Sequence, residues 1–289
     1  MVLKLSSLLG IPLIIVSSIS SATTLTSWDI QPKQGIKNKT LESGSVKVVI
    51  DSTPNKESQF QTDFDYKIYH QDRLYLQEKD STYLAPAKVN LVDLDKDGTA
   101  EVIVSTFSGG AHCCTSFNIY SWQKDKFTKT ATGNLDGEGG SFVDLNKDGK
   151  YEFITYDNSF LYTFSSYAGS YPPTLIYSFE GGKFQDITHK YPQKMREVLN
   201  GMYNSLRESQ KNKGEINGIL AGYVAQKILL GEYEQAWQFM LKNYDKSSDW
   251  GLDIYKGDRV VGKYADFPTA LRAFLIQQGY LKADGKPPK

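Results

Sequence analysis

Apolar and polar residues alternate over short stretches of residues 46–190, and this arrangement repeats along the chain. Val89–Phe107 and Gly140–Asn158 match each other as a strand, an acidic loop and a second strand. The aspartates that open these loops, Asp93 and Asp144, lie 51 positions apart, and each follows an Ile-Tyr pair by 25 positions. A period near 50 residues built from four short strands is typical of β-repeat arrays such as propeller blades.

The pattern becomes helical after residue 190. Residues at helical spacing would form one apolar face there, namely Met195, Leu199, Met202, Tyr203 and Leu206. Three more helices are expected, at Ile216–Leu230, Tyr233–Tyr244 and Pro268–Gln278. The sequence therefore predicts a mainly β fold, with a propeller-like repeat region of about three partial blades followed by an α-helical C-terminal region.

The N-terminus has the layout of a secretory signal peptide. Lys4 precedes the apolar run Leu8–Val16, and small residues follow at 20–22. We expect a signal peptide at 1–22, a polar leader at 23–45, a β-repeat domain at 46–190 and an α-helical domain at 191–289. No long apolar stretch follows residue 22, so we expect a periplasmic or secreted protein without a transmembrane segment after cleavage.

The charge balance limits the choice of partner. The chain has 33 basic and 33 acidic residues, which gives a net charge of zero. A nucleic-acid-binding protein usually carries a basic patch or stripe, so binding to nucleic acid is not expected. We expect the partner to be another protein or a component of the cell envelope.

The strongest chemical signal is the pattern D-x-[DN]-x-D-G-x-x-E, which occurs twice. Acidic loop 1 (residues 93–101) offers Asp93, Asp95, Asp97, the Thr99 carbonyl and Glu101. Acidic loop 2 (residues 144–152) offers Asp144, Asn146, Asp148, the Lys150 carbonyl and Glu152. Alternating oxygen ligands of this kind suit Ca²⁺, and loop 1 should bind it more tightly because it carries one more carboxylate. The alternative is a metal-free turn held by Asp and Asn side chains.

This loop pattern, repeated in register with the hairpins, resembles the FG-GAP/VCBS-type repeats of integrin-like propellers. The resemblance covers roughly residues 60–190. It implies that the acidic loops bind calcium and stiffen each blade, while other loops bind partners. The chain departs from the family in having only two acidic loops and about three hairpins, whereas closed propellers usually have four or more blades.

A second candidate site is the variable loop Gly109–Thr115, which holds the two cysteines, Cys113 and Cys114. An exported protein meets an oxidising compartment, so one interpretation is a vicinal disulfide. A second is a pair of reduced, partly buried structural thiols. A third is chemistry at a thiolate beside His112, as a nucleophile, a redox switch or a soft-metal site.

The loop Tyr162–Pro173 is rich in aromatic and small residues, a composition that is common in binding surfaces. His112, Tyr167 and Tyr171 are the candidate binding-loop residues. The alternative is that the tyrosines of this loop pack on the sheet.

These features favour an exported, calcium-stabilised binding or interaction module without catalytic activity. A periplasmic inhibitor or immunity protein acting against an envelope-targeting enzyme is an alternative, because export, modest size and the lack of a recognisable catalytic motif fit it equally well. A third hypothesis is an enzyme that uses Cys113 or Cys114 together with His112.

Overall fold

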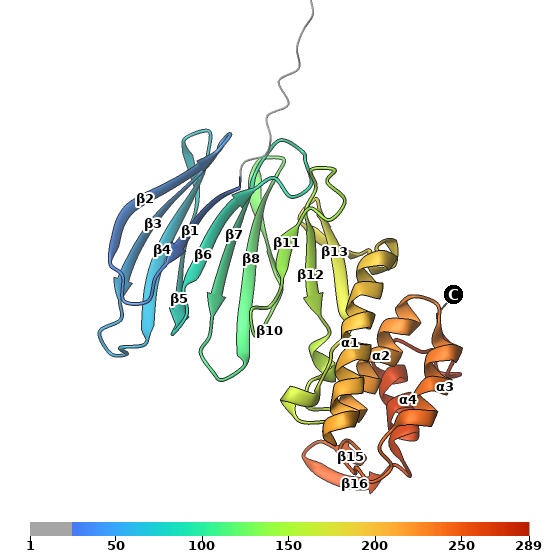
Figure 1. Ribbon diagram of the computed structural model, residues 1–289. Coiled ribbons are helices and arrows are strands. Elements are labelled where there is room, and N and C mark those ends of the chain that lie inside the picture. The colour runs from blue at the N-terminus through green and yellow to red at the C-terminus, as the bar shows by residue number, and fades with distance from the viewer. Residues whose placement is uncertain (1–24, 289) are drawn as a thin grey trace, which may run out of the picture.

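The computed structural model describes residues 25–288, and the predicted signal peptide lies outside them. Three antiparallel sheets stand side by side, and a helical region follows (Figure 1). The first sheet has the order β2-β3-β4-β5, formed by Ile36–Ser43, Val46–Pro54, Gln61–His70 and Arg73–Tyr83. The third has the order β11-β12-β13-β14, formed by Ser141–Val143, Glu152–Tyr156, Thr174–Glu180 and Lys183–Asp186.

The second sheet lies between the other two. Its order is β1-β6-β7-β8, formed by Thr26–Ile30, Ala87–Val92, Glu101–Phe107 and Cys113–Gln123. Two further strands pair with β8, namely β9 (Lys126–Ala131) and β10 (Leu135–Asp136). Strand β7 is buried on both faces because the second sheet lies between the other two, and successive side chains of a strand point to opposite sides. Val102 and Val104 pack toward the first sheet, whereas Ile103 packs toward the third.

The β-region begins earlier than the sequence predicted. Residues 23–45 were expected to be a polar leader, yet β1 and β2 lie within them. Ile30 is fully buried, Leu41 packs in the core between the first two sheets, and Trp28 packs against that core beneath the Lys39 ammonium. The prediction was wrong because Leu41 is the one buried residue of β2, and the pairing of β2 with β3 is irregular between Ile36 and Lys39, so the strand shows no apolar alternation.

The helical region follows β14. After the short 3₁₀ turn η3 (Thr188–Lys190) it contains α1 (Pro192–Asn212), α2 (Asn217–Leu229), α3 (Tyr233–Asn243) and α4 (Phe267–Gln277). A hairpin, β15 (Asp253–Lys256) with β16 (Arg259–Lys263), interrupts the helices and was not predicted. The predicted face of α1 is buried except for Tyr203, which is exposed. The mainly β fold with a C-terminal helical region is thus confirmed.

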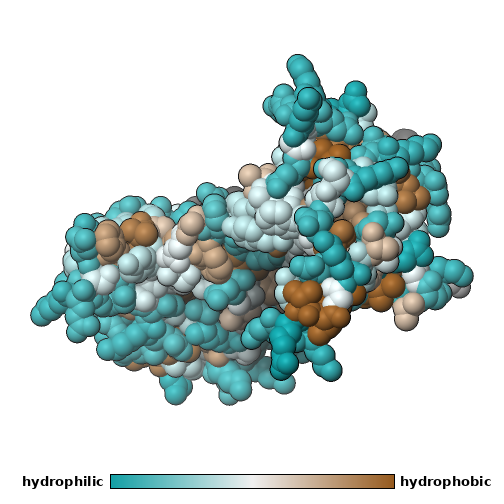
Figure 2. Space-filling model, turned by 90° about the horizontal axis from the view of Figure 1, so that it is seen from below, coloured by the Kyte–Doolittle hydropathy of each residue, from teal (hydrophilic) through white to brown (hydrophobic). Residues whose placement is uncertain are grey.

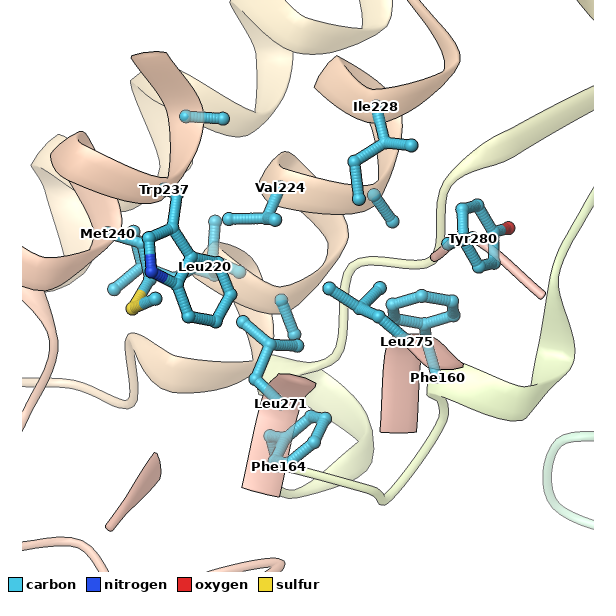
Figure 3. Packing of buried hydrophobic residues seen from close by; sticks show 14 of the residues in the cluster. Phe160, Phe164, Leu220, Val224, Ile228, Trp237, Met240, Leu271, Leu275 and Tyr280 are labelled. Atoms are coloured by element: carbon cyan, nitrogen blue, oxygen red, sulfur yellow. The ribbon is translucent and has the colours of Figure 1, made fainter. Parts of the chain in front are cut away.

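The helical region shares a hydrophobic core with the segment that joins two strands of the third sheet. The segment between β12 and β13 contains η1 (Asn158–Phe160) and η2 (Tyr167–Gly169). It inserts Phe160 and Phe164 among residues of α2 and α4 and the Tyr280 ring (Figure 3). The Gln226 amide oxygen also accepts a hydrogen bond from the Thr174 backbone N–H, at 2.8 Å. The helices therefore fix the position of the 158–172 segment.

The strand orders are open paths, and the strands of residues 25–288 form no closed barrel or propeller. No helix in this part of the chain combines the length and apolar character needed to cross a membrane. Seen from below, the sheet end is mainly hydrophilic, while hydrophobic side chains gather on the helical end (Figure 2). The β15–β16 hairpin carries the exposed Val260 and Val261.

Candidate functional site

Acidic loop 1 brings three carboxylates together. Oxygen atoms of Asp93, Asp95 and Glu101 lie within 4.8 Å of one another. The Asp93 carboxylate accepts the backbone N–H groups of Asp97 (3.0 Å) and Gly98 (2.9 Å), which closes the loop. Asp97 accepts the Thr99 N–H at 2.8 Å. Loop closure therefore uses Asp93 and Asp97 and leaves Asp95 out.

Asp95 and Glu101 indicate that loop 1 fits a cation. The Asp95 Oδ2 accepts the Gly181 N–H at 3.2 Å, but its Oδ1 is buried and has no hydrogen-bond partner within residues 25–288. Glu101 is 1% exposed and accepts hydrogen bonds from the Leu94 N–H and the Ser121 hydroxyl. Burial raises the pKa of Glu101 to about 8, and the Asp95 and Asp97 carboxylates contribute. A hard cation would compensate for both the partnerless oxygen and this repulsion.

Acidic loop 2 satisfies its own side chains. Asp144 accepts the N–H groups of Asp148 and Gly149, and Asp148 accepts those of Lys150 and the Asn146 amide. The Leu145 N–H donates to Glu152. Backbone and amide donors, chiefly the Lys150 N–H, hold the pKa of Asp148 below its ordinary value. These bonds describe a self-supporting Asx-type turn, and metal binding by loop 2 stays an untested prediction.

The two acidic loops lie against each other at one end of the sheets. The Lys96 ammonium of loop 1 donates to the Asp148 carbonyl of loop 2, at 2.6 Å. The Tyr151 N–H donates to the Leu94 carbonyl at 2.9 Å. Together with the bond from Gly181 to Asp95, these contacts join the second sheet to the third. Lys96 also supplies a positive charge beside loop 2.

The predicted binding-loop residues meet beside the cysteines. The structure pairs Cys113 with Cys114 as a vicinal disulfide across a cis peptide bond, and its oxidised state stays a prediction for the protein in solution. The neighbouring His112 ring stacks on the Tyr167 ring, with centroids 3.9 Å apart. The Tyr167 hydroxyl donates to Asp136 at 2.6 Å. This hydrogen bond raises the pKa of Tyr167 to about 12.

Tyr167 and Tyr171 line a cavity of about 430 Å³, which we call the aromatic groove. Its walls come from β10, β12, the 158–172 segment and α1. The lining residues are Asp136, Tyr156, Asn158, Leu161, Tyr167, Ser170, Tyr171, Pro172, Val198, Gly201, Met202 and Ser205. A second cavity of about 370 Å³ shares Tyr156 and Asn158 and opens between the second and third sheets.

Two glycines of α2 allow this wall of the groove to form. A Cβ at Gly222 would collide with the Tyr171 carbonyl oxygen, and one at Gly218 would collide with Ser165 and the Gly169 carbonyl. The 165–171 segment can therefore lie directly on the helix backbone. This close approach positions Tyr167 and Tyr171.

Sequence reasoning missed several groove residues, among them Asp136 and Tyr156. Asp136 enters the site through its pairing with Cys113 in the β10–β8 register. Tyr156 ends β12 and remains 53% exposed. An exposed tyrosine at a strand end directly before an aromatic loop was the one available signal, whereas nothing local to Asp136 indicated its place.

Comparison with known proteins relates the chain to a different group from the one its loops resemble. Residues 189–279 match the family model described as the sll0997 C-terminal domain. The chain is 38% identical over 208 residues to "Probable thylakoid lumen protein sll0997" from a Synechocystis species, covering 68% of this chain and 61% of that protein. It is 35% identical over 208 residues to "Uncharacterized protein y4bJ" from Sinorhizobium fredii, covering 32% of that protein. The chain thus spans less than two thirds of either relative.

No solved structure matches the chain. The predicted FG-GAP/VCBS membership is wrong, because the matching family model is that of the sll0997 C-terminal domain and the relative is a probable thylakoid lumen protein. The misleading feature was local. An Asp-rich turn between two strands satisfies its own backbone, as acidic loop 2 does, so the same loop chemistry can arise in unrelated folds.

Proposed function

We propose that this chain is an exported binding module that holds its ligand in the aromatic groove and catalyses no reaction. The observation that carries the proposal is the assembly of the groove from three separate stretches of the chain, at Asp136, residues 156–172 and residues 198–205. A largely apolar cavity of this size with a few polar groups is the usual form of a ligand site. Positioning of its wall by Gly218 and Gly222 supports a groove that exists before the ligand binds.

The surroundings of His112 support binding over thiol catalysis. A paired Cys113 and Cys114 would offer no thiolate to act as a nucleophile. The His112 ring lies against Tyr167, so it serves as part of the wall that carries the groove tyrosine.

We further infer that acidic loop 1 binds Ca²⁺ and that the three sheets form a propeller-like scaffold. Asp93, Asp95 and Glu101 would hold the ion, with Asp97 and the Thr99 carbonyl as further oxygen donors. The ion would neutralise the carboxylates that lie where loop 1 meets the third sheet. Three neighbouring antiparallel sheets support the propeller-like arrangement.

The name of the Synechocystis relative supports an exported location for this chain, in agreement with the predicted signal peptide. A periplasmic, secreted or lumenal compartment would then supply the ligand. This compartment also permits a disulfide.

Photo-crosslinking tests the proposed function directly. A benzophenone amino acid replaces Tyr156 in the groove in one variant, and the more exposed Tyr255 of β15 in a control variant. Both are irradiated in the organism that makes the protein, and adducts are identified by mass spectrometry. We expect a discrete adduct from position 156 and none from position 255. Identical adducts, or none at either position, would contradict the proposal.

A further inference from the structure

The lining of the aromatic groove carries a single charge, which is negative. Asp136 is the only charged residue among the twelve that line it. The Asp136 Oδ2 accepts the Tyr167 hydroxyl, whereas its Oδ1 has no hydrogen bond to residues 25–288. An anionic ligand would meet this carboxylate without a compensating base, so the lining disfavours it.

The lining of the adjoining cavity also carries a single negative charge. Asp157 is its one charged lining residue. That carboxylate is fully engaged, since its two oxygens accept hydrogen bonds from Ser159 and from the Tyr280 hydroxyl. Asp136 is therefore the carboxylate with an oxygen left for a ligand.

The aromatic lining has the matching chemistry. Tyr156, Tyr167 and Tyr171 border the groove, and the face of an aromatic ring carries a partial negative charge that attracts a cation. The Tyr167 hydroxyl bond to Asp136 holds a ring and a carboxylate together, while His112 supports the ring by stacking. Apolar side chains from the 158–172 segment and α1 complete the walls. Rings, one carboxylate and an apolar surface together suit an ammonium group that bears alkyl substituents.

We propose that the aromatic groove binds a small organic cation through its alkylated ammonium group. This inference rests on the proposed function and names the class of ligand. The cavity of about 430 Å³ falls within the range of small-molecule sites, which favours a free amine over the side chain of a partner protein. Asp136 would pair with the charge while the three tyrosines contact the alkyl groups.

Calorimetric titration of the full chain with choline tests this assignment. A neutral carbon isostere, dimethylbutanol, has the same shape without the charge. We expect saturable choline binding, with the isostere weaker by about fivefold or more, because a cation–aromatic contact contributes about 1 kcal/mol. Asp136→Asn retains an oxygen for the Tyr167 hydroxyl but removes the charge. Because a partly exposed ion pair contributes up to about 1 kcal/mol, this substitution should weaken choline binding by about fivefold and affect the isostere less.

Two matched variants complete the experiment. Asp258→Asn, at an exposed position of the β15–β16 turn, should bind choline like the original chain. Tyr156→Leu retains apolar bulk and should weaken choline binding more than binding of the isostere. The assignment is overturned if choline does not bind, if the isostere binds equally well, or if only a lysine-containing peptide binds. An adduct at position 156 combined with no choline binding would overturn this inference and leave the proposed function standing.

Discussion

The His112 ring and the Tyr167 ring stack with centroids 3.9 Å apart and planes inclined by 19°. The Tyr167 hydroxyl donates to Asp136, and Asp136 pairs in the sheet with Cys113, the residue after His112. The contacts thus form a closed circuit through two loops and a strand. Because Asp136 and Tyr167 also line the aromatic groove, a substitution at one of these contacting residues should alter the positions of the others.

Tyr167→Phe tests this circuit by removing one hydroxyl. We expect the free energy of unfolding to fall by about 1 kcal/mol, the usual value for a lost hydrogen bond. The pKa of Tyr167 is raised to about 12 from 10.0, so the bond stabilises the fold below pH 10.0 and is lost as the pH rises through 12. Urea unfolding at neutral pH and an absorbance titration of the tyrosines measure the two effects. Unchanged values in both, judged against Tyr255→Phe, would contradict the circuit.

Gly222→Ala tests how the groove wall is positioned. The added Cβ would collide with the Tyr171 carbonyl oxygen, so we expect destabilisation by about 1–3 kcal/mol, as for overpacking in a core. Gly201→Ala, in α1, is the matched control because a Cβ there would meet no atom within 4 Å in the described part of the chain, apart from its neighbouring residues and its own helix backbone. That substitution should stabilise the helix by about 1 kcal/mol. Equal effects of the two substitutions would show that the segment does not rest on α2.

Glu101 should make the metal-free protein sensitive to pH. Its pKa is raised from 4.5 to about 8, so the folded state binds the proton more tightly than the unfolded state does. The contribution of Glu101 to the free energy of unfolding should therefore be greatest below pH 4.5 and should be lost as the pH rises to about 8. Denaturant unfolding in EDTA across this range measures the slope attributable to Glu101. Glu101→Gln should flatten the profile, and an identical profile in both proteins would refute the assignment.

The state of the cysteines can be read by alkylation. If Cys113 and Cys114 form the disulfide found in the structure, iodoacetamide will not label the protein denatured without reductant. After reduction, two labels should appear in the intact mass. Labelling without reductant would show free thiols and restore the hypothesis of a thiolate beside His112.

The sequence predicted element types better than element limits. The apolar run of β7 reflects burial between two sheets, and the helical face of α1 is buried at Met195, Leu199, Met202 and Leu206. Strands β1 and β2 were missed because each has a single buried residue, Ile30 and Leu41 respectively, which is too few to show an apolar alternation. The β15–β16 hairpin was missed because its side chains are largely exposed and show no alternation in burial.

The groove was predicted only in part. His112, Tyr167 and Tyr171 stood out through the aromatic composition of their loops. Asp136 reaches the site through strand pairing across more than 20 residues, and such pairing depends on register that a local pattern does not carry. The sequence distinguished the two acidic loops only by the one additional carboxylate of loop 1. The structure adds two further differences in their surroundings. The Lys96 ammonium bonds to the Asp148 carbonyl of loop 2, and the buried Asp95 Oδ1 of loop 1 has no hydrogen-bond partner within residues 25–288.

Calorimetric titration of Ca²⁺ into the EDTA-treated chain tests the proposed scaffold most directly. We predict one calcium ion per chain, bound by acidic loop 1. Asp95→Asn should abolish the binding, and Asp148→Asn should leave it intact. The assignment would be contradicted if no calcium bound, if Asp95→Asn bound it normally, or if Asp148→Asn abolished binding.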